Sequence, residues 1–240
     1  MQVKVVFSSD GEIILPVHYN EYLQGFVYKN LDDDIGKILH NEGFKYEKRS
    51  FKLFSFSRVI GEFRLLRDKG VIVFKPPISV WFSFGIREVG LSFLKNIYDK
   101  RQVLAGNPIT ISDVNIKTYD IKGDLVVKTL SPITTYQTVY GNGKRKTVYY
   151  SPRDENFINL VKFNLLKKYK VVYGEDYYGD LEFKGLRGFK MSIVKYKNTV
   201  IKAWNGVFYL NGDKRILELA LYCGLGAKNS QGFGFVVPRI

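Results

Sequence analysis

The residues with the clearest chemical potential lie in a glycine-rich segment near the C-terminal end of the chain. Two Gly-apolar-Gly triplets, Gly224–Gly226 and Gly232–Gly234, flank a polar segment that contains Lys228 and Asn229. Glycine lets the backbone adopt positive φ and approach a ligand closely, which exposes N–H groups that can hold phosphate oxygens. The segment has neither the Gly-Lys-Ser/Thr of a P-loop nor the Gly-x-Gly-x-x-Gly of a dinucleotide site. It indicates a phosphate-binding loop, with a tight helix-to-strand turn as the alternative.

A second group of candidate phosphate ligands follows a predicted Gly141-Asn142-Gly143 turn: Lys144, Arg145 and Lys146, with tyrosines nearby. Basic side chains beside aromatic rings can follow phosphates and stack on unpaired bases, although a solvated loop tip has the same composition. The net charge of the whole chain is +14, of which residues 1–121 contribute +3 and residues 122–240 contribute +11. Such a basic half indicates an acidic partner, and nucleic acid is the commonest one.

Several other classes of protein are disfavoured by what the chain contains. Cys223 is the only cysteine, and His18 and His40 are the only histidines, so we expect no disulfide, no zinc site and no other metal or cofactor. The N-terminus lacks the apolar core of a signal peptide, and no apolar stretch approaches the roughly 20 residues that cross a bilayer. We therefore expect a soluble, cytoplasmic protein without membrane contact.

The order of the predicted elements is the same in both halves of the chain. In the first half, strands are expected over 2–8, 51–60, 71–74, 79–84 and 109–119, and helices over 20–31, 32–40 and 87–101. In the second half, strands are expected over 124–130, 189–196, 200–210 and 233–237, helices over 154–170 and 213–222, and a hairpin over 137–150. Both orders approximate β-α-β-β-α-β. The sequence thus predicts an α+β protein with two tandem ferredoxin-like, RRM-like domains with antiparallel sheets, over 1–120 and 124–240.

The glycine-rich segment also carries a family resemblance. Gly224–Gly234 resembles the signature glycine loop of the RAMP superfamily of CRISPR-associated RNA-binding proteins. Its place before a short last strand is similar to the CRISPR repeat endoribonuclease family. The resemblance implies two ferredoxin-like domains and RNA contacts at Gly224, Gly226, Lys228, Asn229, Gly232 and Gly234. In similar proteins a β-hairpin in the second domain binds repeat RNA, which adds Arg187 and Lys190.

Three segments of the first half are similar to archaeal-type members of that family: Pro16–Tyr28, Leu39-His40 and Lys52–Ser57. In that family a tyrosine, a histidine and a lysine at these places form the catalytic set. Matched residue by residue, they become Tyr28, His40 and Lys52, with Lys45 and Lys48 as alternatives for the lysine. The partner that this implies is CRISPR repeat RNA of a precursor transcript, and CRISPR effector-complex subunits are possible further partners.

These residue types suit RNA cleavage without a metal ion. The 2′-hydroxyl attacks the adjacent phosphate, and the products are a 2′,3′-cyclic phosphate and a 5′-hydroxyl. A histidine can act as base or acid near neutral pH. A tyrosine is better suited to donating a proton or a hydrogen bond, and a lysine stabilises the developing negative charge. The alternatives are a non-catalytic RAMP subunit that holds guide RNA and a general single-strand RNA binder. Taken singly, Tyr28 could be a core residue, His40 a surface residue and Lys52 a snorkelling side chain.

Overall fold

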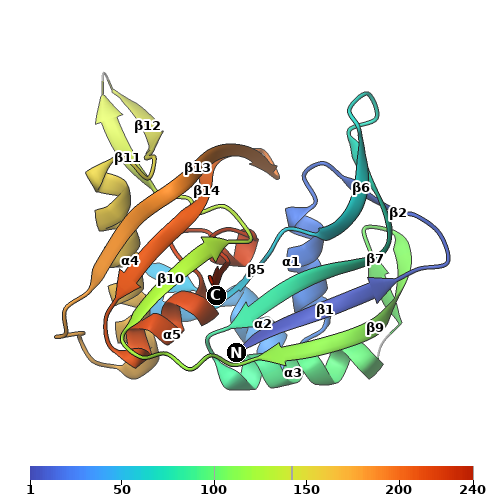
Figure 1. Ribbon diagram of the computed structural model, residues 1–240, viewed down its shortest axis with the longest axis horizontal. Coiled ribbons are helices and arrows are strands. Elements are labelled where there is room, and N and C mark those ends of the chain that lie inside the picture. The colour runs from blue at the N-terminus through green and yellow to red at the C-terminus, as the bar shows by residue number, and fades with distance from the viewer. Residues whose placement is uncertain (100, 142, 240) are drawn as a thin grey trace.

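Two antiparallel sheets, one in each half of the chain, form the framework of the computed structural model in Figure 1. The structure describes residues 1–99, 101–141 and 143–239, so Asn142 of the predicted hairpin turn lies outside the described residues. Helices and loops cover the sheets, and both chain termini lie where the two halves meet (Figure 1). No helix in this described part is long and apolar enough to cross a membrane.

The N-terminal sheet has the strand order of a ferredoxin-like unit. Its strands are β1 (Gln2–Ser8), β2 (Ile13–Pro16), β5 (Phe54–Phe56), β6 (Ile60–Leu66), β7 (Val71–Phe84), β8 (Gln102–Leu104) and β9 (Asn107–Lys117). The central strand β1 lies between β7 and β9, while β5 and β6 pair with the far edge of β7. Strands β3 (Phe44–Tyr46) and β4 (Arg49–Phe51) form a separate small hairpin.

The described residues of this half form three helices: α1 (Asn20–Lys29), α2 (Asp33–Asn41) and α3 (Arg87–Asp99). Helix α1 buries Leu23, Phe26 and Val27 at the spacing of one helical face. The ring of Phe26 packs edge-on against Phe7 of β1, with 5.4 Å between centroids. Helix α2 follows an acidic run, whose charges in the first turn favour the helix dipole. The C-terminal ends of α1 and α2 lie close together, since Tyr28 and His40 in their last turns are in contact.

The C-terminal half repeats the arrangement. Its elements are β10 (Asp124–Thr129), β11 (Tyr136–Gly141), β12 (Lys144–Tyr149), α4 (Glu155–Tyr173), β13 (Glu182–Tyr196), β14 (Thr199–Asn211), α5 (Lys214–Cys223), a short 3-10 turn η1 (Asn229–Gln231) and β15 (Val236–Pro238). The sheet order is β13-β14-β10-β15, and β11 and β12 form the predicted basic hairpin outside it. Strand β9 ends and β10 begins on either side of the predicted boundary.

Two strand predictions in the first half are wrong in detail. The strand predicted over 51–60 contains β5 and reaches β6 only at Ile60. The stretches 71–74 and 79–84 form one continuous strand, β7, which runs through Pro76 and Pro77. On one edge of β7, β2 pairs with residues 71–74 and β1 with residues 78–83, so the prolines fall between two partners. On the other edge, the register with β6 shifts at the same place. The missing proline N–H groups therefore cost the sheet no ladder bond.

The two halves pack closely. The Gln2 side-chain amide donates to the carbonyls of Leu221 (2.9 Å) and Val236 (2.8 Å), and its oxygen accepts from the Tyr119 hydroxyl at 2.8 Å. Leu53, from the first half, belongs to the hydrophobic core of the second. The interface thus combines a buried polar network with apolar contact, and it fixes the glycine-rich segment against the first half.

Candidate active site and RNA-binding cleft

The structure brings the three predicted catalytic side chains together. Tyr28 lies in the last turn of α1, His40 in the last turn of α2, and Lys52 between β4 and β5. The rings of Tyr28 and His40 meet edge-on with 5.2 Å between centroids. The ammonium of Lys52 donates to the backbone carbonyl of His40 at 2.8 Å. We call these three residues the catalytic cluster; their role in catalysis stays a prediction.

Burial shifts the pKa values of two members of the catalytic cluster, Tyr28 and Lys52. The half-buried phenol of Tyr28 packs on Phe54, and desolvation, aided by nearby Tyr196, raises its pKa to about 12. Tyr28 therefore remains protonated at neutral pH and can donate but not abstract a proton. Desolvation lowers the pKa of Lys52. His40 is exposed, and its Nδ1 lies 3.0 Å from the Asn41 side-chain oxygen.

The alternative lysines lie away from this contact. Lys45 is exposed on β3 and forms an ion pair with Glu42 at 3.5 Å. Lys48 is exposed in the turn between β3 and β4. Of these three lysines, only Lys52 has a described contact with His40, so the geometry favours Lys52 as the lysine of the cluster.

The glycine-rich segment folds into a loop that is bonded mainly to the protein itself. Gly224, Gly226, Gly232 and Gly234 all have positive φ, between 68° and 83°. Leu225 N donates to Gly234 O at 2.8 Å, which ties the two triplets together. The four glycines are buried, whereas residues 227–231 between them are partly exposed. Any direct RNA contact of this loop is therefore made by its polar middle.

The side chain of Lys168 in α4 is 1% exposed and forms hydrogen bonds to the glycine loop. Its ammonium donates to Gly224 O at 2.6 Å and to Asn229 Oδ1 at 2.7 Å. The Asn229 amide in turn donates to Leu225 O and Phe233 O at 2.9 and 3.0 Å. Asn229 thus serves the shape of the loop, and burial lowers the pKa of Lys168 to about 8.

The glycines are needed for this close packing. A Cβ on Gly226 would lie 2.6 Å from Thr134 O, and one on Gly232 would lie 2.7 Å from the Asn20 amide nitrogen. Valine at either position would therefore strain the fold as well as block a phosphate. Such variants do not separate a structural from an RNA-binding role of the loop.

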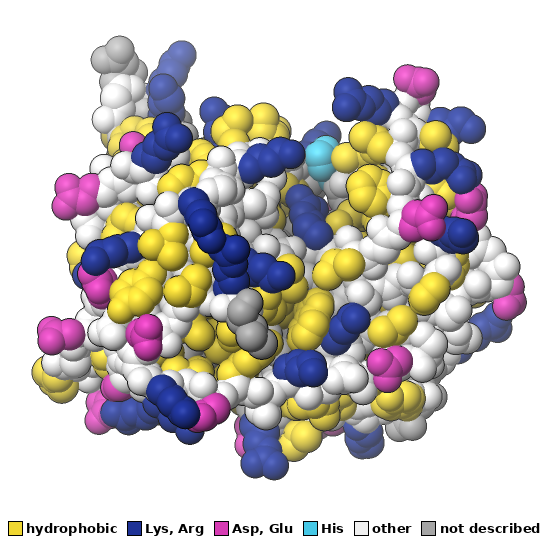
Figure 2. Space-filling view, in the orientation of Figure 1, with side chains coloured by type: hydrophobic (Ala, Val, Ile, Leu, Met, Phe, Trp, Pro, Cys, Tyr) yellow, Lys and Arg dark blue, Asp and Glu magenta, His cyan; other side chains and the backbone are white. Residues whose placement is uncertain are grey.

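The other predicted RNA contacts lie apart from the catalytic cluster. Lys144, Arg145 and Lys146 are exposed on β12 of the basic hairpin. Arg187 and Lys190 are exposed on β13, at irregularities in its register with β14. On the face drawn in Figure 2, Lys and Arg side chains run over the hairpin and across the middle of the molecule, while Asp and Glu lie mainly toward its outline. The arrangement provides a positive path across the junction of the two halves.

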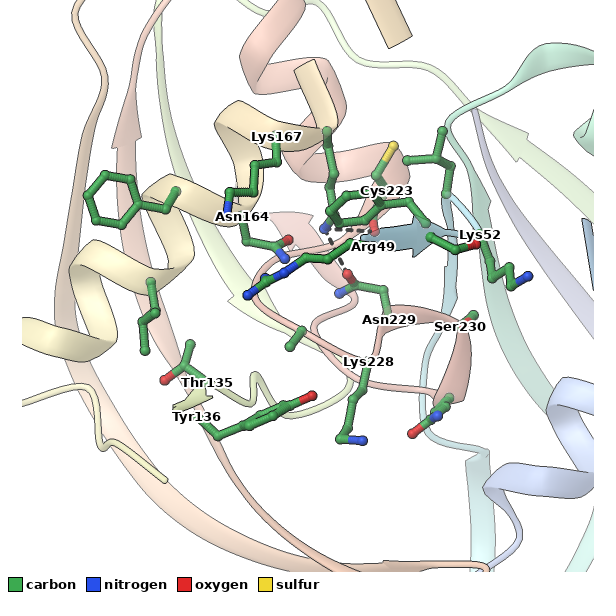
Figure 3. A pocket seen from close by; sticks show the side chains of 18 of the residues that line it. Arg49, Lys52, Thr135, Tyr136, Asn164, Lys167, Cys223, Lys228, Asn229 and Ser230 are labelled. Atoms are coloured by element: carbon green, nitrogen blue, oxygen red, sulfur yellow. Dashed lines mark hydrogen bonds between the residues drawn. The ribbon is translucent and has the colours of Figure 1, made fainter. Parts of the chain in front are cut away.

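Beside Lys52 opens a cavity of about 940 Å³ between the two halves. It is lined by β4, the start of β11, α4 and the polar middle of the glycine loop. In Figure 3, Arg49 extends toward Asn164 and Lys167, Tyr136 lies beside Lys228, and Lys52 lies on the opposite side of the view. Among the residues that the structure describes, no three His, Cys, Asp or Glu side chains gather to hold a metal ion.

The C-terminal part of the chain matches the family described as "CRISPR associated protein Cas6, C-terminal" over residues 113–238, more than half of the chain. The chain belongs to the Cas6 family. The family expected from the glycine loop is thereby confirmed.

Similar proteins extend this Cas6 relationship over the whole chain. The chain is 27% identical over 242 residues to "CRISPR-associated endoribonuclease Cas6 1" of Methanocaldococcus jannaschii, with 99% of this chain and 92% of that protein covered. It is 28% identical over 246 residues to "CRISPR-associated endoribonuclease Cas6" of Pyrococcus furiosus, with 95% and 85% covered. A solved structure titled "CRISPR associated protein Cas6" superposes with a TM-score of 0.82 at 25% identity, covering 100% of this chain and 99% of the other. The ferredoxin-like α+β fold is confirmed.

Sequence reasoning missed the cavity of this Cas6-family chain. Arg49, Lys167 and Asn164 come from elements on which no motif was visible. Lys168 left a signal, because it continues the buried face of α4 that includes Val161 and Leu165. A lysine on an apolar helical face is rarely buried without a polar partner, and here the partner is the glycine loop.

Proposed function

We propose that the chain is an endoribonuclease that cuts within the repeat RNA of CRISPR precursor transcripts, by attack of a 2′-hydroxyl and without a metal ion. The observation that carries this proposal is the contact of His40 with both Tyr28 and Lys52, where Lys52 also lines the basic cavity. The curated relatives named as CRISPR-associated endoribonucleases support the same substrate class.

In the proposed reaction, the 2′-oxygen loses its proton and forms a bond to phosphorus. The bond from phosphorus to the 5′-oxygen then breaks, and the 5′-oxygen gains a proton. His40 either accepts the proton of the 2′-hydroxyl or supplies the proton that the 5′-oxygen gains, since imidazole is the side chain that exchanges protons near neutral pH. Tyr28, which its raised pKa keeps protonated, donates a hydrogen bond to the phosphate or a proton to the leaving 5′-oxygen. The Lys52 ammonium offsets the negative charge that builds up on the phosphate.

The test uses purified protein and its cognate repeat RNA in EDTA. We expect cutting at one position, with a 2′,3′-cyclic phosphate on one product and a 5′-hydroxyl on the other. A 2′-deoxy nucleotide 5′ of the scissile phosphate should abolish cutting and leave binding intact. Normal cutting of the deoxy RNA would refute the 2′-hydroxyl mechanism, and dependence on added divalent ions would refute metal independence.

The second candidate is a Cas6-family protein that holds guide RNA for an effector complex and does not cut it. The two-domain fold and the basic cleft suit both functions equally. Tight binding of repeat RNA with no product after prolonged incubation would support this candidate over the nuclease.

A further inference from the structure

The cavity beside Lys52 contains more positive charge than the cleavage chemistry requires. Five cationic side chains line it, and no lining residue carries a carboxylate: Arg49, Lys52, Lys167, Lys168 and Lys228. None of these five takes part in an ion pair between described residues. The free protein therefore gathers several cations around one cavity without an acidic partner, and this local positive potential favours the binding of an anion.

Two of these cations rest on aromatic rings. The Lys228 ammonium lies 5.3 Å from the centroid of the Tyr136 ring, and the Lys167 ammonium lies 5.8 Å from that of Tyr46. Desolvation lowers the pKa of Lys228, as it does for Lys52. A phosphate would be a stronger partner for Lys228 than a ring, since it carries a full charge. Movement of the Lys228 ammonium to a phosphate would free one face of the Tyr136 ring for stacking on a base.

The wall of the cavity also holds unsatisfied polar atoms. Among the described residues, the buried side-chain atoms without a hydrogen-bond partner are Thr135 Oγ1, Asn164 Oδ1 and Gln231 Oε1, and all three residues line this cavity. Thr135 is 2% exposed. Buried polar groups in native proteins are nearly always paired, so three orphans in one wall mark it as a surface that takes a hydrogen-bonding partner.

The kind of orphan narrows the chemistry of that ligand. Two of the three are amide oxygens, which only accept hydrogen bonds. A phosphate has no hydrogen to offer them at neutral pH, whereas the amino and imino groups of a nucleobase do. The cations require an anion and the amides require a donor. A nucleotide supplies both.

We propose that this cavity binds one unpaired nucleotide of the repeat RNA, next to the point of cleavage. Its phosphates lie among Arg49, Lys167 and Lys228, and its base faces Tyr136 and the amide oxygen of Asn164. The volume of about 940 Å³ accommodates a base with its sugar. Lys52 belongs to the catalytic cluster and also lines the cavity, so this nucleotide lies close to the scissile phosphate. The inference rests on the proposed function in taking repeat RNA as the ligand.

The first experiment measures binding of uncleavable repeat RNA, with a 2′-deoxy nucleotide at the cleavage point, across a salt series. Lys167→Met should weaken binding and make the log K versus log salt slope shallower by about 0.7 for each lost phosphate contact. Lys162→Met is the matched control, because Lys162 lies on the same helix but does not line the cavity. Equal effects of the two changes would overturn the phosphate part of the proposal.

The second experiment tests the base. Each nucleotide near the cleavage point is made abasic in turn, and binding is compared for wild type and Asn164→Leu. At one position, removing the base should weaken wild-type binding about tenfold, while Asn164→Leu should lose roughly threefold to tenfold on intact RNA and nothing further on that abasic RNA. Equal sensitivity of both proteins at every position would overturn base binding.

The thermal midpoint separates this role from a structural one. Asn164→Leu removes an orphaned acceptor, so the free variant should melt no lower than wild type even though it binds RNA less well. A variant that melts lower and binds all RNAs uniformly less well would assign Asn164 to the fold and overturn the proposal. If the wild-type protein shows the expected dependence on one base but never cuts repeat RNA that keeps all its 2′-hydroxyls, the nuclease function is refuted and the nucleotide site is still supported.

Discussion

Replacement of Tyr28 by phenylalanine removes one hydroxyl and keeps the ring that packs on His40 and Phe54. Because the pKa of Tyr28 is raised to about 12, only about one molecule in 10⁵ carries the tyrosinate at pH 7. A mechanism that used Tyr28 as the base would run on that small fraction. We therefore expect Tyr28 to act as a donor to the phosphate or the leaving oxygen.

Loss of one donor aimed at a developing charge lowers rates by about 10²- to 10³-fold. We expect Tyr28→Phe to slow cleavage by that factor. The ratio of the wild-type and variant rates should stay constant from about pH 6 to pH 9, since Tyr28 stays protonated throughout this range. Single-turnover cleavage with excess protein measures the chemical step without product release, and Tyr22→Phe on the same helix is the control.

A tyrosinate base would give a different result. The wild-type rate would then keep rising about tenfold per pH unit toward pH 12, and Tyr28→Phe would abolish that rise. A rate ratio that grows with pH would refute the donor role. A variant that cuts within a few-fold of wild type at every pH would remove Tyr28 from the mechanism.

Three further predictions follow from the same geometry. His40→Ala should slow cleavage by about 10²-fold or more with little change in RNA affinity, and Lys52→Ala should also slow it; single-turnover rates and binding titrations check both. Reversing the charges of Lys144–Lys146 should weaken RNA binding and flatten its salt dependence, whereas reversal of Arg67 in the first half should do much less. Because the folded-state pKa of Lys168 is lowered to about 8 from 10.5, the unfolded chain binds more protons between these values. Lys168 therefore adds stability as the pH rises through this window and loses it as the pH falls through about 8, and Lys168→Met should abolish this part of the pH dependence in thermal melts.

The strands and helices were largely predictable because each half alternates apolar positions at the period of its elements. In α1, for example, the buried Leu23, Phe26 and Val27 stand at helical spacing. The sequence does not predict the short strands β2, β3, β4 and β8, since three- or four-residue segments carry too little periodicity. It predicts β6 only at Ile60, because six of the seven residues of this strand are exposed and show no alternation of burial. The sequence predicts two strands where β7 is one, because Pro76 and Pro77 normally interrupt a strand. The sequence alone does not reveal that both prolines fall between two strand partners, where no N–H is needed.

The site was predictable only where a motif accompanied it. Tyr28, His40 and Lys52 lie in segments that resemble a known family, and the structure brings them together. The cavity is different, because Arg49 and Asn164 come from β4 and α4, more than a hundred residues apart. Neither residue stands out in its own segment. Only the packing of the two halves creates the cavity that both line.

The glycine loop relates the catalytic cluster to this cavity. Its η1 turn is held to the first half by the Asn20 amide, which donates to Gln231 O at 2.6 Å. Its start is held to the second half by Lys168, which donates to Gly224 O at 2.6 Å. The loop is thus fixed from both sides while its middle, with Lys228, faces the cavity. The backbone freedom of glycine here serves the tight path of the chain, and that path places Lys228 from one half at the cavity that Lys52 from the other half also lines.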